Sequence, residues 1–206
     1  MTRSEALRLE GGGQTEAAPP PVGRKLKPAK LLWPLYHGDN CTGLSGLYAI
    51  LNAIRLAIAY KHSLTDPELY RIMRAGLRFL EGRVTPTQLI GSGLRVNLWR
   101  TMAEAMTEVT LREAGAWVRI ERVFVSGPGT RAAFDAIEDA IERLRPVMML
   151  CRGGRYTVVS GFTTSSLLLF DSAGSCWIKK HVCGVPGDFD SARHVLYPAS
   201  FLAVSA

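Results

Sequence analysis

The chain of 206 residues is poor in cysteine and in histidine, with four of each. Its cysteines are too few and too irregularly spaced for a disulfide framework, and none belongs to a Cys-x-x-Cys pair with metal-ligand spacing. These features exclude the class of small disulfide-rich secreted proteins. We therefore expect no metal, no other cofactor and a reducing, cytoplasmic location.

The chain also lacks a long hydrophobic run. Its longest apolar stretch, residues 44–59, is interrupted by Ser45, Asn52 and Arg55, and it is shorter than the roughly 20 residues that a membrane-spanning helix needs. The N-terminus carries acidic residues and glycines where a secretion signal would need a basic start and an apolar run. We expect neither a membrane partner nor a signal peptide.

A third absence concerns sites for nucleic acids and nucleotides. The net charge is +7, but no stripe of Lys and Arg alternates with aromatic residues, so a solvated basic surface is favoured over a nucleic-acid site. The glycines of 11–13 and 91–93 lack the strand before them and the helix after them that a phosphate-binding loop requires. We propose no nucleotide site from the sequence.

What is present is the composition of a folded domain preceded by a tail. Hydrophobic residues make up 47% of the chain and charged residues 21%, which is typical of a globular protein. Residues 1–30 combine glycine, proline and charge without apolar periodicity, so they cannot bury enough surface to offset the entropy of ordering. The sequence predicts a flexible tail over 1–30 and one domain over 31–206, with no internal repeat.

The first half of the domain has helical periodicity. Apolar residues recur every three or four positions from Ser45 onward, and a helix start is indicated by Thr65, which precedes a proline and a glutamate. The helices predicted in this way span 45–60, 65–80, a stretch from 85 that the glycines at 91 and 93 interrupt, 94–113 and, later in the chain, 130–144.

The hydrophobic periodicity changes from helical to strand-like in the second half of the domain. Short runs rich in β-branched and aromatic residues, separated by Gly, Thr and Ser, indicate strands. These runs cover 117–124, 146–152, 156–162, 165–172, 176–182 and 193–198, and the last of them is predicted to be the final strand. Helices followed by antiparallel strands predict an α+β domain in which the N-terminal helices pack on one side of an antiparallel sheet.

The stretch 40–54 runs from a turn into the first long helix, with Ser45 followed by Gly46 at the predicted helix start. Backbone N–H groups and the helix dipole favour negative charge at such a position, which would activate a thiol nucleophile. Residues 45–53 resemble the Cys-Gly-helix motif of papain-like cysteine peptidases, especially the bacterial branch that includes the double-glycine leader peptidases. In that family a cysteine stands where this chain has Ser45.

The second half extends this resemblance over about residues 35–182. The strand 154–162 matches the family's Gly-His-aromatic strand, and 167–172 matches a later strand that ends in an aspartate. Arg155 falls in the histidine position and Asp171 in the aspartate position. The resemblance implies the papain-like (cysteine proteinase) fold and a substrate groove between the helix that begins at Ser45 and the sheet.

The departures from the family motif decide the expected activity. Serine without a base is a poor nucleophile, and an arginine stays protonated in proteins, so Arg155 cannot act as that base. Where the family has an oxyanion-stabilising amide this chain has Asp39, followed by Asn40; an anionic Asp39 would repel an oxyanion, whereas Asn40 could serve. We hypothesise that Arg155 and Asp171 form an ion pair in place of the imidazole–carboxylate pair.

The favoured function is therefore a catalytically degenerate peptidase-like protein that binds a peptide or protein segment in the former groove. One alternative is an active papain-like thiol hydrolase with Cys41 as the nucleophile and His37, or another histidine, as the base. A further alternative is a partner-binding module whose basic tail docks on nucleic acid or on an acidic protein. The ligand and the oligomeric state stay open.

Overall fold

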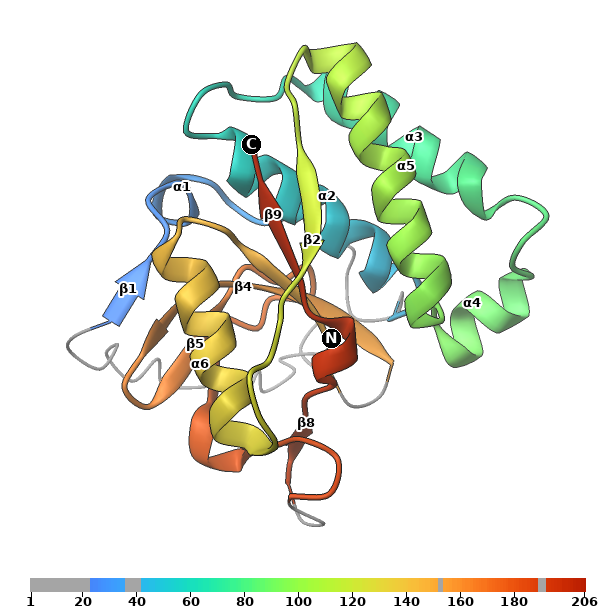
Figure 1. Cartoon of the computed structure of the whole chain (residues 1–206). Coiled ribbons are helices and arrows are strands. Elements are labelled where there is room, and N and C mark those ends of the chain that lie inside the picture. The colour runs from blue at the N-terminus through green and yellow to red at the C-terminus, as the bar shows by residue number, and fades with distance from the viewer. Residues whose placement is uncertain (1–22, 36–41, 152–153, 189–191) are drawn as a thin grey trace, which may run out of the picture.

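The computed structural model describes residues 23–35, 42–151, 154–188 and 192–206. It is a mixed α+β structure with an antiparallel sheet, as the order of helical and strand periods predicts (Figure 1). The helices are α1 (Pro28–Leu31), α2 (Ser45–Ile58), α3 (Asp66–Leu80), α4 (Pro86–Ser92), α5 (Val96–Ala114) and α6 (Gly129–Glu142), with short 3-10 helices η1 (Thr42–Leu44), η2 (Lys180–Val182) and η3 (Pro198–Ser200).

The strands build one large sheet and one small one. They are β1 (Gly23–Lys25), β2 (Arg119–Arg122), β3 (Val147–Cys151), β4 (Arg155–Thr163), β5 (Ser166–Leu169), β6 (Trp177–Lys179), β7 (Cys183–Gly184), β8 (His194–Val195) and β9 (Leu202–Ser205). The seven-stranded sheet has the order β2-β9-β3-β4-β5-β6, and β1 also pairs with β4. Strand β4 lies at its centre, paired with β3 over its first half and with β1 over its end.

Helix α2 is the central helix of the domain. Its apolar residues at helical spacing, among them Leu47, Ile50 and Ile54, are at most 1% exposed, and the helix packs against β3, β4 and β9. Helices α3 and α5 pack on each other and on α2. None of the helices in the described ranges is long and apolar enough to cross a membrane.

Most local start and stop signals act as the sequence predicts. The Glu68 carboxylate accepts the backbone N–H of Thr65 at 2.7 Å, which satisfies a donor at the start of α3. Gly82, just beyond the end of α3, has a φ of 72°, a left-handed conformation that glycine adopts without steric cost. Helix α4 continues through Gly91 and ends at Ser92, before Gly93. The start of α3 and the end of α4 before Gly93 are confirmed, whereas the predicted break at Gly91 is wrong.

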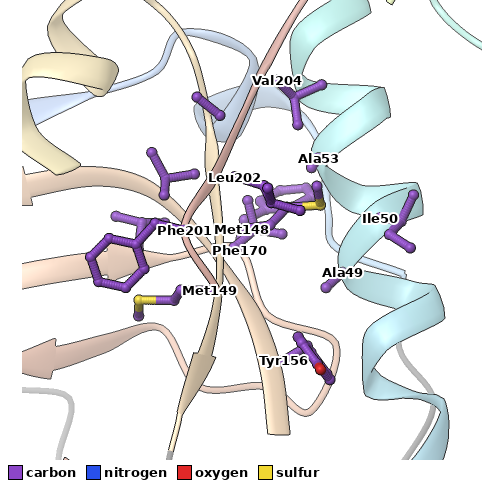
Figure 2. Packing of buried hydrophobic residues seen from close by; sticks show 14 of the residues in the cluster. Ala49, Ile50, Ala53, Met148, Met149, Tyr156, Phe170, Phe201, Leu202 and Val204 are labelled. Atoms are coloured by element: carbon purple, nitrogen blue, oxygen red, sulfur yellow. The ribbon is translucent and has the colours of Figure 1, made fainter. Parts of the chain in front are cut away.

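The N-terminal helices α2, α3 and α5 lie on one side of the sheet, as the sequence predicts, but α6, from the second half of the chain, covers the other face. Figure 1 shows α2, α3 and α5 on one side of the strands and α6 on the other. Consecutive residues of β3 point to opposite faces, with Met148 on the α2 side and Met149 on the other (Figure 2). The run 156–161 of β4 is buried without interruption, which is the pattern of a strand covered on both faces.

The predicted last strand is also wrong. Only His194 and Val195 of the run 193–198 form a strand, β8, which pairs in parallel with β7 in the small sheet. The chain then continues into β9, which lies between β2 and β3 in the large sheet. Strand β9 is buried on both faces, so its sequence lacks the apolar–polar alternation that marks a half-exposed strand.

Residues 23–30, which the sequence predicts as the end of the flexible tail, pack on the sheet. Strand β1 runs antiparallel to β4, with Gly23 opposite Thr163 and Lys25 opposite Gly161. Leu26, which follows β1, is 1% exposed, and its N–H donates to the Ser160 carbonyl at 2.8 Å. Residues 23–30 therefore belong to the domain, and the boundary expected between 30 and 31 is corrected. Residues 1–22 lie outside the described part.

The close approach of β1 to β4 depends on the absence of a side chain at residue 161. A Cβ atom on Gly161 would lie 2.5 Å from the Arg24 carbonyl oxygen and 2.7 Å from the Lys25 Cα. Both are backbone atoms, so β1 would have to move. We expect Gly161→Ala to lower the free energy of unfolding by about 1–3 kcal/mol, as overpacking does, measured by denaturant unfolding.

The control is a chain that begins at residue 27 and therefore lacks β1. In that shorter chain Gly161→Ala is expected to cost much less, because the backbone that the new methyl group meets is gone. An equal cost in both chains would show that the β1–β4 contact is not the source of the effect.

Candidate functional site

Ser45 is the first residue of α2 and follows η1 directly. Its side chain is buried, with the residue 1% exposed. The Ser45 Oγ accepts the backbone N–H of Tyr156, on β4, at 3.1 Å. The hydroxyl oxygen therefore serves a structural purpose, because it satisfies a buried backbone donor at the junction of helix and sheet.

Arg155 and Asp171 form the ion pair that the sequence predicts. Arg155 begins β4, and its Nη2 donates to the Asp171 Oδ2 and, at 3.3 Å, to the Ser175 hydroxyl. Asp171 follows β5, which pairs with β4. Its side chain is 1% exposed, against 33% for that of Arg155. The buried carboxylate is therefore paired with a cation that is partly exposed to solvent.

The peptide between residues 155 and 156 joins these two contacts into one site. Arg155 supplies the guanidinium, and the next residue, Tyr156, supplies the N–H that Ser45 accepts. The structure therefore brings together Ser45 from α2, Arg155 from β4 and Asp171 from the segment after β5. A connected set of this kind orients its members, because each polar group fixes the next.

An aromatic pair holds the start of α2 against β4. The rings of Trp99 and Tyr156 have centroids 4.1 Å apart. The Trp99 indole N–H donates to the Gly46 carbonyl at 2.9 Å, and the Tyr156 hydroxyl donates to the Leu94 carbonyl at 2.6 Å. Burial raises the pKa of Tyr156 well above its usual value, so the phenol stays protonated. A Cβ at Gly46 would lie 2.9 Å from the indole ring, which gives a packing reason for the glycine after Ser45.

The sequence did not single out Trp99 or Tyr156 as parts of the site. In the sequence, Trp99 lies inside the predicted helix 94–113, and Tyr156 is the aromatic position of the strand 154–162. For Tyr156, the position directly after Arg155 in the sequence is a signal that could have been used. For Trp99 there is no such signal, because its contact spans 53 positions of the chain.

The site offers no base to Ser45 from the described residues. A guanidinium has no acceptor and keeps its proton. His62, His181 and His194 are described, and none of them is hydrogen bonded to Ser45. The pKa of His194 is lowered by burial first, and then by the charges of Arg193 and Arg155. None of the three described imidazoles is therefore placed to take a proton from Ser45 through a direct hydrogen bond.

Two of the three described cysteines have thiols that are poor nucleophiles. Burial raises the pKa of the Cys151 thiol to about 12 and that of Cys183 to about 11, so both stay protonated at neutral pH. Cys176 is exposed. Across the described ranges, no group of three or more His, Cys, Asp or Glu side chains could hold a metal ion.

The remaining predicted site residues lie outside the described part of the chain. These are the oxyanion candidates Asp39 and Asn40, the alternative nucleophile Cys41 and its possible partner His37. Their roles stay predictions.

A pocket of about 230 Å³ opens beside Asp171. One wall is the segment from β1 through α1 to Pro34, and the other is the turn after β5. The pocket is lined by Lys25, Ala29, Lys30, Leu31, Leu32, Trp33, Pro34, Leu169, Phe170, Asp171, Gly174, Ser175 and Cys176. The Asp171 Oδ1 is buried, and no donor among the described residues reaches it. Ser45 and Asp171 are both buried, so the position open to a ligand is formed by the exposed residues of the pocket wall.

The chain matches no family model, and neither the curated proteins nor the solved structures include one that matches it. The function has to follow from the chemistry of the site itself.

The ion pair should contribute to stability in a way that can be measured. Arg155→Met leaves the buried Asp171 carboxylate without its cation, and an uncompensated buried charge costs several kcal/mol. Because a third of the arginine side chain is exposed, we expect the lower end, a loss of about 2–3 kcal/mol in the free energy of unfolding.

Adding Asp171→Leu to Arg155→Met should recover most of that loss, because the unpaired charge is then gone. Arg78→Met is the matched control: Arg78 is exposed on α3, and surface changes of this kind stay within about 0.5 kcal/mol. A loss for Arg155→Met no larger than for the control would show that the pair contributes nothing.

Proposed function

We propose that this protein is a catalytically inactive member of the papain-like class that binds a peptide or protein segment beside its former catalytic position. The support for a papain-like arrangement is the placement of Ser45 at the start of the central helix, against the first residues of β4. Arg155 and Asp171 stand where the resemblance puts a histidine and an aspartate.

The observation that carries the inactive part of the proposal is the contact of Arg155 with Asp171. A cysteine or serine peptidase needs a group that first takes a proton from the nucleophile and then returns it. Here the carboxylate that would orient that group binds a permanent cation instead. The Ser45 oxygen is also engaged by the Tyr156 N–H, so the nucleophile position and the base position are both used for structure.

The binding part of the proposal has support in the pocket beside Asp171. An extended peptide presents main-chain N–H groups and side chains in alternation, and it binds to surfaces that combine acceptors with small pockets. The pocket beside Asp171 has room for one side chain of such a peptide. We further propose a cytoplasmic location, which the free cysteines Cys151, Cys176 and Cys183 favour.

The experiment compares hydrolysis of a mixture of fluorogenic peptide amides by the wild type and by variants. The wild type is expected to show no turnover above that of Ser45→Ala. The double substitution Ser45→Cys with Arg155→His is expected to produce turnover at least about tenfold above the wild type, because it places a thiol at a helix N-terminus beside an imidazole that Asp171 can orient.

The contradicting outcome is hydrolysis that depends on Cys41. Turnover by the wild type that survives Ser45→Ala but disappears in Cys41→Ala would identify an active thiol hydrolase, and the inactive assignment would then be wrong. The double variant serves as the positive control for the substrate mixture.

A further inference from the structure

The pocket beside Asp171 has an apolar side that is open to solvent. Leu31 is 72% exposed and Trp33 is 78% exposed, and both line the pocket. Two large apolar side chains next to each other on a surface are typical of a contact site for another apolar group, whereas single exposed residues are common. Trp is also among the residues most often found to dominate binding energy at protein interfaces.

The same pocket has two cations at its rim. Lys25 and Lys30 are exposed and line the pocket, and within the described ranges neither has a carboxylate partner. Their charges are free to attract an acidic group. The Asp171 carboxylate does not neutralise them, because it is buried and bound to Arg155.

Asp171 does not itself offer an acceptor to a ligand. Its side chain is 1% exposed, and its Oδ1 is buried. A ligand that suits the two accessible features of the pocket has an apolar side chain and an acidic group.

The wall that carries Leu31 and Trp33 is anchored to α2 on its far side. The buried Asn52 side chain accepts the Leu35 N–H at 2.8 Å, and the Arg55 guanidinium donates to the Trp33 carbonyl at 2.8 Å. The backbone beneath the exposed apolar side chains is therefore positioned before any ligand arrives, which lowers the ordering cost of binding.

We propose that this pocket docks a peptide segment in which an acidic residue is next to a large apolar residue. The apolar side chain of the segment packs on Leu31 and Trp33, and the acidic side chain faces Lys25 and Lys30. The volume of about 230 Å³ is below the roughly 300–1,000 Å³ of sites for drug-sized molecules, so it suits one or two side chains of a longer chain. This inference rests on the proposed peptide-binding function and specifies its ligand.

The test uses three fluorescein-labelled peptides of equal length. The first alternates glutamate with leucine and tryptophan, the second has lysine in place of glutamate, and the third has serine in place of the apolar residues. Fluorescence anisotropy with the full chain is expected to give the lowest Kd for the first peptide, by about tenfold over each of the others. Binding should weaken as salt is added, because exposed charges contribute.

Variants then locate the binding position. Lys25→Glu with Lys30→Glu is expected to raise the Kd of the acidic peptide about tenfold, and Trp33→Ala should raise it about fivefold. The matched control is Arg74→Glu with Arg78→Glu, which makes the same charge change at exposed positions of α3. Since all five residues are exposed, the variants should fold, which circular dichroism verifies.

A second readout does not depend on any substitution. Cys176 is exposed and lines the pocket, so saturating acidic peptide should slow its alkylation by iodoacetamide, followed by mass spectrometry, at least about fivefold relative to the serine-containing peptide.

The outcomes separate this inference from the function on which it rests. If the acidic peptide binds but neither the lysine pair nor Trp33 affects its Kd, the pocket assignment is wrong while peptide binding stands. Preference for the lysine-containing peptide would also overturn the pocket assignment alone. If none of the three peptides binds, the assignment of this ligand class fails, whereas the hydrolysis assay still decides whether the protein is inactive.

Discussion

The contact between Arg155 and the buried Asp171 determines what this site can do. A carboxylate inside a protein needs a partner, and the choice of partner sets the chemistry that is possible. An imidazole at residue 155 could accept a proton from a nucleophile at residue 45 while Asp171 orients its ring. A guanidinium instead holds its protons and only anchors β4 to the segment after β5. The Ser45 hydroxyl oxygen, which accepts the Tyr156 N–H, then has a structural use.

The parts of the fold that the sequence predicts well are those whose signals are local. Helix α2 follows from its apolar spacing, and the start of α3 follows from the Thr65 and Glu68 side chains within one turn. Strands β1 and β9 were missed because each is short and is held by its neighbours. The position of α6 on the second face was not predictable either, because β4 includes the polar residues Thr157 and Ser160, so its sequence does not show that both of its faces are buried.

The same distinction between local and long-range signals applies to the candidate site. The pair of Arg155 and Asp171 was predictable, because paired strands place their ends at a short offset, here 16 residues. The pocket was not predictable, because the segment around Trp33 has no periodicity and depends on side chains 17 and 22 positions away, those of Asn52 and Arg55, for its position. These long-range hydrogen bonds position the surface that the proposed peptide would contact. The local sequence around Trp33 gives no signal of them.

The most direct test of this account is NMR of the arginine side chains in the intact protein. If Arg155 is bound to a buried carboxylate, its guanidinium N–H signals should be resolved at neutral pH and protected from exchange with water. Substitution of Asp171 by asparagine should remove that protection, while the signals of the exposed Arg78 stay unchanged. Arg155 signals that exchange as fast as those of Arg78 in the unaltered chain would contradict the account.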